Sequence, residues 1–251
     1  MGVMTGKLIV FEGGEGCGKT TQIQRLYGWL AESEILQVLR TKNGVTGVRQ
    51  TREPGGTGLG QQIRRLLLNN TESEGSPILS KTELLLYAAD RAQHVEETLR
   101  PWLEKGYWVL CDRYTDSTVA YQGYGRQLDI ELIDQLNQIA TGGLKSDLTL
   151  WLNVPPAVGL ARMKKRGEAD RIEQAGETFH HRVAAGFAVL AQSGEQRGVC
   201  RSDSSPAVNF MSSGPTVEID GEQSVEAVAK EIQSVVQDCL VRWYPKAAKS
   251  E

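Results

Sequence analysis

Short hydrophobic runs alternate along this chain with longer segments in which apolar residues recur every three or four positions. The runs lie at residues 7–11, 107–111, 148–152 and 216–219, with a weaker one at 48–51. Short continuous apolar runs are typical of strands buried on both faces, whereas the longer spacing is typical of amphipathic helices. Helices are expected at 20–31, 60–68, 80–99, 130–139, 156–166, 179–192 and 225–240. This alternation predicts an α/β fold with a parallel sheet of about five strands and helices on both of its faces.

Local signals mark where the longest expected helix begins and ends. Ser80 is followed three residues later by Glu83, the spacing of a capping box, which predicts a helix start at this point. Pro101 is expected to interrupt or bend the end of the helix, because proline cannot donate a backbone hydrogen bond.

Two other segments carry little periodicity. Residues 31–49 surround Asn43-Gly44 and Gly47 with polar residues, which favours a surface connection. Residues 193–215 are rich in Ser and Gly, which predicts a loop or a partly disordered insertion. No internal repeat or second core is visible, so a single domain is expected over residues 1–251.

The residues that follow the first strand match a phosphate-binding loop. Gly13 and four further residues precede Gly18-Lys19-Thr20, between an expected strand and an expected helix. In this pattern backbone N–H groups surround a polyphosphate, the Lys ammonium reaches the outer phosphates and the Thr hydroxyl contacts magnesium. We therefore expect the residues that bind ATP to be Gly13, Gly14, Glu15, Gly16, Cys17, Gly18, Lys19, Thr20 and Thr21.

The phosphate loop alone does not identify a reaction, because P-loop proteins include switches, motors and small-molecule kinases. The Asn/Thr-Lys-x-Asp and Asp-x-x-Gly elements of switch GTPases are absent. The strand at 107–111 ends in Asp112-Arg113 rather than in the Asp-Glu pair typical of a motor. A cation at a strand end beside the phosphate loop is suited to a second phosphate group, which favours a kinase.

Composition narrows the partners and the compartment. A net charge of −3 and a pI near 5.8 argue against a general nucleic-acid-binding protein. The four cysteines are scattered without paired metal spacing, so we expect no disulfides and a reducing cytoplasmic location. No apolar run is long enough for a signal peptide or a membrane span, so no membrane partner is expected.

Four motifs, in order, resemble those of thymidylate kinases and cover most of the chain. They are Phe11 to Thr21, Thr51-Arg52-Glu53-Pro54-Gly55-Gly56-Thr57, Asp112-Arg113-Tyr114 with Ala120-Tyr121-Gln122-Gly123, and Arg166 to Glu173. The resemblance implies transfer of the γ-phosphoryl group of ATP to dTMP, which gives dTDP for dTTP biosynthesis. It also implies a Mg²⁺ cofactor and a homodimer.

The resemblance further implies which residues act on the phosphates. Lys19 would bridge the donor phosphates, Thr20 and Asp112 would support the metal, and Arg113 would hold the acceptor phosphate. Glu15 would contact the 3′-hydroxyl of the acceptor sugar and reach the water shell of the metal. A mobile lid is expected at about 162–173, and the bacterial type of the family carries a catalytic arginine there, for which Arg166 and Arg171 are the candidates.

Selection of the acceptor base is expected from the long helix and from the loop after Asp112. Tyr87 and Arg91 are four residues apart and so share one helix face. By resemblance, Tyr87 stacks on thymine and Arg91 reaches its carbonyl edge, while Tyr121 packs near the sugar C2′. The other residues that the resemblance places at the base are Arg64, Ser117, Thr118 and Gln122.

Two alternatives stay open at this point: a kinase of another nucleoside monophosphate or of a deoxynucleoside, and a nucleotide-binding protein without turnover. Compared with the compact bacterial pattern, extra residues lie near 40–47 and across 195–213. The second extra segment lies where the family approaches the adenine pocket, so no residues are assigned to adenine.

Overall fold

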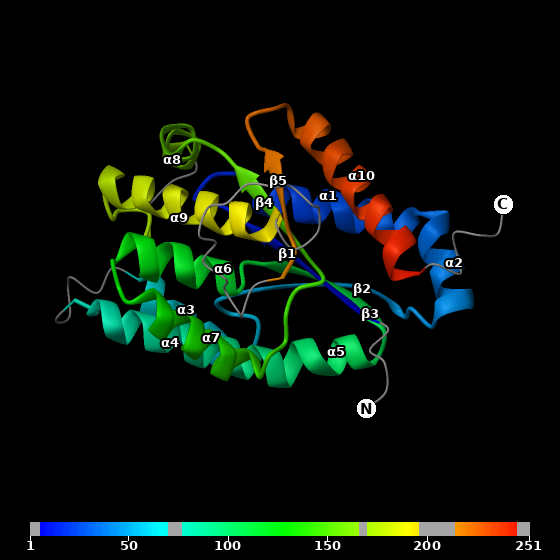
Figure 1. Cartoon of the computed structure of the whole chain (residues 1–251), viewed down its shortest axis with the longest axis horizontal. Coiled ribbons are helices and arrows are strands. Elements are labelled where there is room, and N and C mark those ends of the chain that lie inside the picture. Colours follow the sequence, from blue (N-terminus) through cyan, green and yellow to red (C-terminus); the bar gives the residue numbers. More distant parts are fainter. Residues whose placement is uncertain (1–5, 70–76, 166–169, 196–213, 245–251) are drawn as a thin grey trace.

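A computed structural model describes residues 6–69, 77–165, 170–195 and 214–244 (Figure 1). Five strands form one sheet in the order β2-β3-β1-β4-β5, and every neighbouring pair is parallel. The strands are β1 (Lys7–Glu12), β2 (Gly47–Arg52), β3 (Tyr107–Asp112), β4 (Leu148–Asn153) and β5 (Thr216–Asp220). The predicted α/β fold with a parallel sheet is therefore confirmed.

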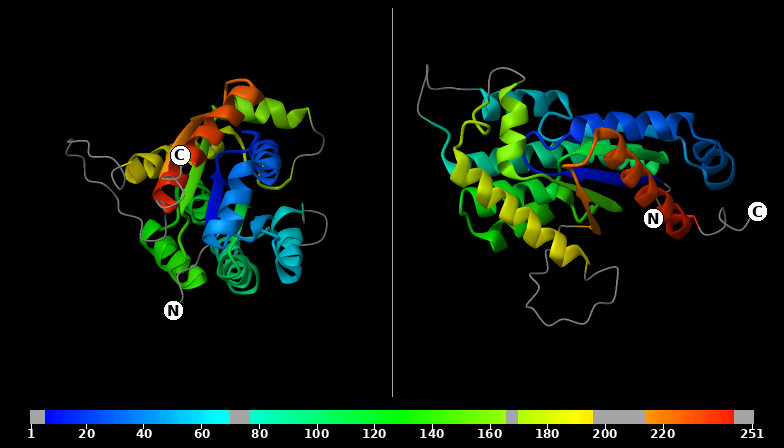
Figure 2. Two further views of the ribbon diagram at one scale, coloured as in Figure 1. Left: turned by 90° about the vertical axis from the view of Figure 1, so that its right-hand side faces the viewer. Right: turned by 90° about the horizontal axis from the view of Figure 1, so that it is seen from above.

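Helices cover both faces of this sheet, as Figures 1 and 2 show. One face packs against α1 (Lys19–Glu32), α2 (Glu34–Asn43) and α10 (Val225–Trp243). On the other side lie α3 (Gly58–Leu68), α4 (Ser80–His94), η2 (Val95–Leu99), α5 (Arg100–Glu104) and α7 (Ile130–Thr141). The short α6 (Thr115–Thr118) and η3 (Val119–Gly125) follow β3, and α8 (Pro156–Lys164) and α9 (Glu177–Glu195) follow β4.

The three central strands, β3, β1 and β4, are buried along most of their length because successive side chains enter opposite cores. Ile9 and Phe11 of β1 pack in one core with side chains from α1 and α10. Leu8 and Val10 of the same strand pack in the other core, against η2 and α5. All four side chains are at most 1% exposed. Parallel pairing brings the carboxyl ends of β1 and β3 to one edge of the sheet, where the phosphate loop and Asp112-Arg113 begin.

The expected surface connection at 31–49 is wrong for most of its length. Residues 34–43 form α2, which begins where the Ser33 hydroxyl accepts a hydrogen bond from the Leu36 amide at 3.3 Å. Gly44 ends the helix in the left-handed region, at φ 69°. Leu36 and Leu39 are buried, and their contribution to the core outweighs the polar character of the segment.

The long helix also differs from the expectation. It begins at Ser80 without a side-chain cap, so the predicted capping box is wrong, and the Glu83 carboxylate binds other side chains instead. The helical path from α4 continues through η2, a π-helical turn, into α5. Pro101 lies in the first turn of α5, directly after the π-helical turn, and the wider spacing of that turn accommodates a residue that has no N–H to donate.

Two expected loops are shorter than predicted. The segment after Asp112 is helical, because α6 and η3 follow Tyr114 directly. Helix α9 extends to Glu195, and the rest of the expected insertion, residues 196–213, lies outside the described residues. Residues 166–169 of the expected lid lie outside them as well, whereas Arg162 belongs to the last turn of α8.

The phosphate loop rests directly on the backbone of α8. A Cβ added to Gly159 of α8 would lie 2.1 Å from the Glu15 carbonyl oxygen. A Cβ added to Gly16 would lie 2.1 Å from the Gly159 carbonyl oxygen. Glycine at both positions is therefore required for the loop and the helix to approach each other.

This contact leads to a prediction for Gly159→Ala. The added methyl group meets backbone, so we expect a loss of roughly 1–3 kcal/mol in the free energy of unfolding and weaker ATP binding. Denaturant unfolding and an ATP titration measure the two effects. Gly28→Ala in α1 is the matched control: its Cβ would meet nothing within 4 Å, and it is expected to stabilise the helix by about 0.5–1 kcal/mol. Unchanged stability and ATP affinity in Gly159→Ala would contradict the close packing.

Candidate active site

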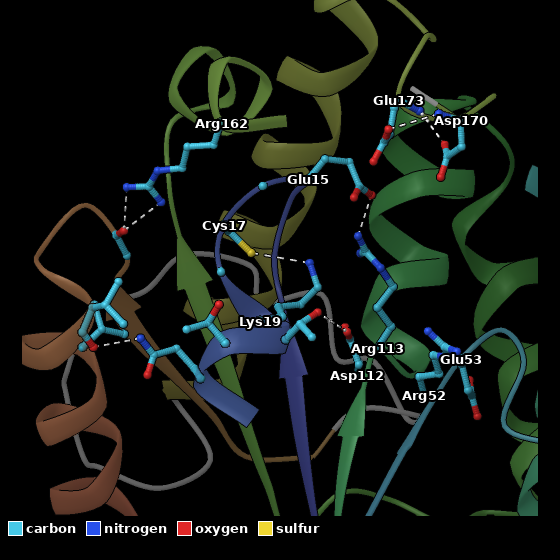
Figure 3. A pocket seen from close by; sticks show the side chains of 18 of the residues that line it. Glu15, Cys17, Lys19, Arg52, Glu53, Asp112, Arg113, Arg162, Asp170 and Glu173 are labelled. Atoms are coloured by element: carbon cyan, nitrogen blue, oxygen red, sulfur yellow. Dashed lines mark hydrogen bonds and ion pairs between the residues drawn. The ribbon is translucent and has the colours of Figure 1, made fainter. Parts of the chain in front are cut away.

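A cleft of about 510 Å³ runs along the carboxyl edge of the sheet (Figure 3). Its floor is the phosphate loop and the first turn of α1, and its far end is formed by Gly221, Gln223, Val225 and Val228. The predicted ATP-binding residues that line it are Glu15, Gly16, Cys17, Gly18, Lys19, Thr20 and Thr21. Gly13 and Gly14 lie behind this surface and contribute their carbonyl oxygens to the lysine.

The loop holds Lys19 in place by its own backbone. Lys19 Nζ donates to the carbonyl oxygens of Gly13 and Gly14, each at 3.0 Å. Its third neighbour is Cys17 Sγ at 3.5 Å. Gly18 has a φ of 100°, a conformation that side chains disfavour and that turns the loop into α1. Lys19 is only 7% exposed, so its positive charge is held within the loop.

Thr20 and Asp112 face each other across the floor of the cleft. Thr20 Oγ1 lies 3.5 Å from Asp112 Oδ2, at the limit of a hydrogen bond. Asp112 Oδ1 is buried and has no hydrogen-bond partner. Hydroxyl and carboxylate oxygens are the ligand types that Mg²⁺ accepts, with the remaining positions filled by water or phosphate. These two residues therefore fit a magnesium ion.

Arg113 occupies the junction between β3 and the helices that follow it. Its backbone lies in the left-handed region at φ 70°, which is uncommon for a residue with a side chain and is found at functional sites. Its guanidinium donates to Glu15 Oε1 at 2.5 Å, to Gly13 O at 3.1 Å and to Ser117 Oγ at 3.2 Å. The group is thus fixed beside the phosphate loop.

A second pocket, of about 80 Å³, opens from the same junction. Five residues line both cavities: Glu15, Glu53, Arg64, Arg113 and Asp170. The other residues of the second pocket include Pro54, Leu68, Tyr87, Arg91, Ser117, Thr118, Tyr121 and Ile172. The structure therefore brings seven of the predicted acceptor-site residues to one pocket: Arg64, Tyr87, Arg91, Arg113, Ser117, Thr118 and Tyr121. Glu15, an eighth, contributes to both cavities.

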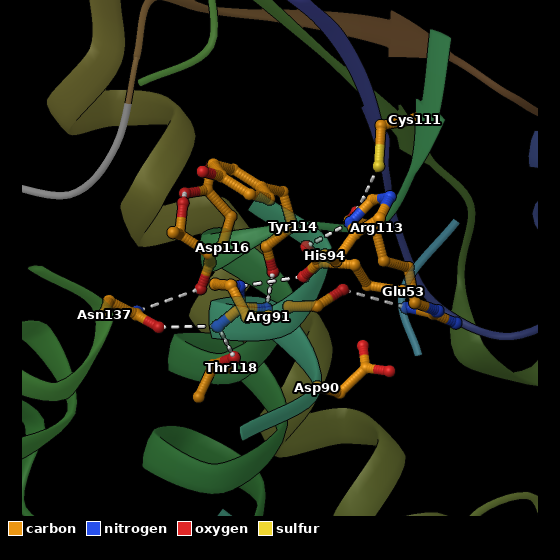
Figure 4. Close-up of polar contacts among 12 residues, drawn as sticks. Glu53, Asp90, Arg91, His94, Cys111, Arg113, Tyr114, Asp116, Thr118 and Asn137 are labelled. Atoms are coloured by element: carbon orange, nitrogen blue, oxygen red, sulfur yellow. Dashed lines mark hydrogen bonds and ion pairs between the residues drawn. The ribbon is translucent and has the colours of Figure 1, made fainter. Parts of the chain in front are cut away.

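Arg91 is the centre of a buried polar network on the floor of the second pocket (Figure 4). Its guanidinium donates to Glu53 Oε2 at 2.8 Å and to Thr118 Oγ1 at 2.7 Å. It also donates to Asn137 Oδ1 at 2.6 Å and to the Tyr114 carbonyl oxygen at 2.7 Å. The side chain is 2% exposed, so its position is set by the protein before any ligand binds.

Two predicted site residues, Gln122 and Arg171, do not line the two cavities. Gln122 does not line the pocket, because its amide donates to Glu83 Oε1 at 2.9 Å. Arg171 donates to Glu83 Oε2 at 2.6 Å and to the Leu67 carbonyl oxygen at 2.8 Å. Arg166 lies outside the described residues.

Comparisons with known proteins agree with this geometry. The family model described as thymidylate kinase matches residues 11–214. The chain belongs to the thymidylate kinase family. It is 49% identical to the thymidylate kinase of Cyanothece sp. (strain PCC 7425 / ATCC 29141) over 98% of this chain and 99% of that one. It is 50% identical to that of Trichormus variabilis (strain ATCC 29413 / PCC 7937), over 96% of this chain and all of that one.

A solved structure is similar as well. The crystal structure of thymidylate kinase from Ehrlichia chaffeensis matches with a TM-score of 0.64 and 30% identity, and the match covers 92% of this chain and 98% of that one. Members of the thymidylate kinase family are nucleoside monophosphate kinases, which transfer a phosphoryl group. The resemblance stated from the four motifs is therefore confirmed, as are the fold and the enzyme class.

Two further residues of this thymidylate-kinase site, His94 and Glu12, were given no role from the sequence. His94 Nδ1 lies 2.8 Å from Glu53 Oε1, and His94 Nε2 lies 2.7 Å from Thr51 Oγ1. The His94 ring therefore helps to hold the Glu53 carboxylate beside Arg91. Glu12, at the end of β1, accepts hydrogen bonds from the Tyr114 amide at 2.8 Å and the Ser117 hydroxyl at 2.6 Å. Charged or ring-nitrogen side chains at otherwise apolar positions were the only available signal.

Burial changes the titration of Glu12. Burial and the nearby charge of Asp116 raise the pKa of Glu12 to about 7. The hydrogen bond from Ser117, the charge of Arg113 and the Tyr114 amide act in the opposite direction. Glu12 therefore titrates near neutral pH at the point where β1 enters the phosphate loop.

Glu15 has the opposite shift. Burial alone would raise its pKa, but the charges of Arg113 and Lys19 and the hydrogen bond from the Tyr121 hydroxyl lower it to about 2. The folded protein thus favours the ionised form more strongly than the unfolded chain does. Its contribution to stability is fully present above the ordinary pKa of 4.5 and is lost as the pH falls from there towards about 2.

This shift predicts a specific pH dependence for Glu15→Gln. The wild-type protein is expected to lose up to about 3 kcal/mol more unfolding free energy than the variant between about pH 6 and about pH 2, because only the wild type takes up the proton on Glu15. Urea unfolding at several pH values, carried down as far as both proteins stay folded, measures the difference. A gap between the two proteins that does not change with pH would contradict the ion-paired state of Glu15.

Proposed function

We propose that this chain phosphorylates dTMP to dTDP with ATP and Mg²⁺, the step that supplies dTDP for dTTP synthesis. The observation that carries the proposal is the junction at which the phosphate-loop cleft and the second pocket share Glu15 and Arg113. A donor in the cleft and an acceptor in the pocket would present their phosphates to each other at this junction. The membership of the family supports the same reaction.

The residues at the junction match the physical requirement of phosphoryl transfer. Two polyanions must be held in line while their mutual repulsion is neutralised, so positioning and positive charge supply most of the catalysis. Lys19 would leave the Gly13 and Gly14 carbonyl oxygens and bind donor phosphates. Arg113 would bind the acceptor phosphate, since a guanidinium can bind two phosphate oxygens at once.

Thr20 and Asp112 are the residues that would hold magnesium, directly or through water. The buried Asp112 Oδ1, which lacks a partner among the described residues, supports this assignment. When bound, Mg²⁺ neutralises charge on the phosphates. Among the described residues no cluster of three or more His, Cys, Asp or Glu side chains could hold a metal ion alone, which agrees with a site completed by substrate.

The second pocket fits a nucleoside monophosphate in which the base lies away from the junction. Tyr87 and Arg91 would bind thymine by stacking and through its carbonyl edge, with Thr118 beside Arg91. Tyr121 donates its hydroxyl hydrogen to Glu15 Oε1 at 2.6 Å, which fixes the ring at the sugar end. Arg64, Ser117 and Gln122 complete the proposed acceptor set, with Gln122 acting from behind the pocket through Glu83.

The lid arginines would supply further positive charge to the transferred group. Arg166 and Arg171 are the two candidates within 162–173. Of the two, only Arg171 has a described position, and in it the guanidinium binds Glu83 and a backbone carbonyl rather than facing the junction. Arg166 is therefore the stronger candidate for direct contact with phosphate.

An acceptor panel tests the proposed substrate. ADP release with ATP and magnesium is measured against dTMP, dUMP, dCMP, AMP and thymidine. Turnover is expected to concentrate on dTMP. Turnover mainly on another monophosphate would overturn the roles of Tyr87, Arg91 and Thr118. Turnover on thymidine would indicate a nucleoside kinase. No turnover on any acceptor would indicate a nucleotide-binding protein without catalysis.

The far end of the cleft fits the donor base, which the sequence left unassigned. Beyond Gln22 the cleft is lined by the apolar side chains of Val225 and Val228 and by Arg162, which donates weakly to the Gly221 carbonyl oxygen at 3.4 Å. A planar guanidinium beside apolar side chains is suited to an adenine ring.

Arg162→Ala is accordingly expected to raise the KM for ATP by roughly tenfold, through loss of a stacking contact worth about 1–2 kcal/mol. The KM for dTMP is expected to stay within about twofold, because Arg162 does not line the second pocket. Steady-state kinetics with each substrate varied in turn measure both values. An equal rise in both KM values would contradict a donor-base contact.

A homodimer and a cytoplasmic location are part of the proposal. The adjacent helices α3, α4 and α7 leave Leu66, Leu85 and Ile139 at least half exposed, and a second copy would cover them. Sedimentation velocity measures the assembly.

Cys17, Cys111 and Cys239 are free and buried, in keeping with a reducing compartment. Among the described residues, no helix combines the length and the apolar character needed to cross a membrane.

A further inference from the structure

A buried carboxylate outside the phosphate sites gathers two arginines. Glu83 of α4 is 0% exposed and lies one helical turn before Tyr87. Its Oε1 accepts from Arg126 Nε at 3.1 Å and from the Gln122 amide at 2.9 Å. Its Oε2 accepts from Arg126 at 3.0 Å and from Arg171 at 2.6 Å. Each carboxylate oxygen thus accepts two hydrogen bonds, from Gln122 of η3, from Arg126 just after η3 and from Arg171.

Arg171 connects this carboxylate to the end of α3. Its Nε donates to the Leu67 carbonyl oxygen at 2.8 Å, and its backbone amide donates to the Leu68 carbonyl oxygen at 3.2 Å. The last carbonyl groups of a helix lack partners within the helix, so Arg171 satisfies two of them. The segment that begins at Asp170 is therefore attached to α3 by its backbone and to α4 by its side chain.

This attachment builds one wall of the second pocket. Asp170 and Ile172, on either side of Arg171, both line that pocket, as does Leu68 at the end of α3. The turn is closed locally, because Asp170 Oδ1 accepts from the Ile172 and Glu173 amides, each at 2.9 Å. Movement of Arg171 would therefore displace two lining residues together.

We propose that Glu83 and Arg171 form an anchor that positions the acceptor wall, and that Arg171 acts through this wall instead of contacting the phosphates. The identity of the acceptor rests on the function proposed above, whereas the anchor itself does not. Glu83 is a positioning residue for the acceptor, and Arg171 acts through it.

The electrostatics support a permanent contact. Burial would raise the pKa of Glu83, but the hydrogen bonds from Arg126 and Gln122 and the charges of Arg126 and Arg171 outweigh it and lower the pKa. The carboxylate is therefore ionised at neutral pH and needs its cationic partners. Removal of one partner of a buried pair leaves an uncompensated charge, which proteins tolerate poorly.

The test compares Glu83→Gln and Arg171→Ala with a matched control, Arg182→Ala. Arg182 also donates to backbone carbonyl oxygens, those of Tyr124 and Gly125, but it does not line either cavity. Hydrogen–deuterium exchange of residues 170–175 is measured in the ligand-free proteins, and steady-state kinetics are measured for dTMP and ATP. Arg171→Lys is included because a lysine retains a positively charged donor for Glu83.

Both anchor variants are expected to exchange at least about tenfold faster at residues 170–175, whereas Arg182→Ala exchanges as the wild type does. The two anchor variants are expected to raise the KM for dTMP by roughly tenfold, whereas kcat and the KM for ATP stay within about threefold of the wild-type values. Arg171→Lys is expected to show a smaller rise in the KM for dTMP than Arg171→Ala does. The double variant Glu83→Gln/Arg171→Ala is expected to show less than the sum of the two single effects, because the two substitutions share the Glu83–Arg171 contact.

Two results would overturn the anchor. One is unchanged exchange in Glu83→Gln, which requires no activity to observe. The other is a loss of kcat of about a hundredfold or more in Arg171→Ala, with an unchanged KM for dTMP and with wild-type kinetics in Glu83→Gln. That result is the behaviour of a group that binds only the transition state. Wild-type protein that fails to use dTMP would contradict the proposed function, while the exchange measurement would still decide the anchor.

Discussion

Lys19→Met is expected to lower kcat by roughly a thousandfold or more, the largest effect of any single substitution in this chain. Lys19 Nζ is the cation that the phosphate loop itself holds, through the Gly13 and Gly14 carbonyl oxygens. Methionine retains the length and the apolar stem of the side chain but has no charge to stabilise the transferred phosphoryl group. The decrease is measured by dTDP formation at saturating ATP and dTMP.

The control for this substitution is Lys230→Met, which removes an exposed lysine from α10 and lies outside both cavities. It is expected to keep wild-type turnover. Thermal unfolding of Lys19→Met should show a folded protein, so that the loss is assigned to chemistry. A Lys19→Met protein that retained more than about a tenth of the wild-type kcat would show that the phosphate loop is not the donor site.

Arg113→Ala is expected to lower kcat/KM for dTMP by about a hundredfold to a thousandfold. The variant removes the charge at the junction of the two cavities and leaves Glu15 without the partner at 2.5 Å. The KM for ATP is expected to change by less than about threefold, since the phosphate loop retains Lys19. Kinetics with each substrate varied in turn separate the two effects.

A ligand without a phosphate gives the matched control for Arg113. Thymidine has the base and the sugar of dTMP but no phosphate, so its affinity is expected to be nearly equal in the wild type and in Arg113→Ala. Calorimetric titration of dTMP and thymidine into both proteins measures this ratio. If thymidine lost as much affinity as dTMP, Arg113 would be shaping the pocket and not holding the phosphate.

The fold was predictable from the sequence where the strands are buried on both faces. Continuous apolar runs such as 107–111 locate such strands, because every side chain along them enters a core. Helix α2 escaped prediction since it contributes only one narrow buried edge, Leu36 and Leu39, within a polar segment. Its stability comes from packing that is visible only once the sheet is assembled.

The candidate site was predictable to the extent that its residues belong to contiguous motifs. The phosphate loop and Asp112-Arg113 predict where the two phosphates would bind, because their chemistry depends on local backbone geometry. The two arginine partners of Glu83 could not be predicted from a contiguous motif. The pattern Ser80 to Glu83 has the spacing of a cap, yet the carboxylate binds Arg126 and Arg171, which lie far away in sequence and come together only through tertiary packing.

The most direct test of the account follows the phosphorus atom itself. ATP labelled at the γ-position is incubated with the wild-type protein, magnesium and dTMP, and the products are separated. The label is expected in the β-phosphate of dTDP, in an amount equal to the ADP formed, which shows that the γ-phosphoryl group of ATP is transferred to dTMP. Label released as inorganic phosphate, with dTMP unchanged, would contradict the central claim that this site joins a donor and an acceptor phosphate.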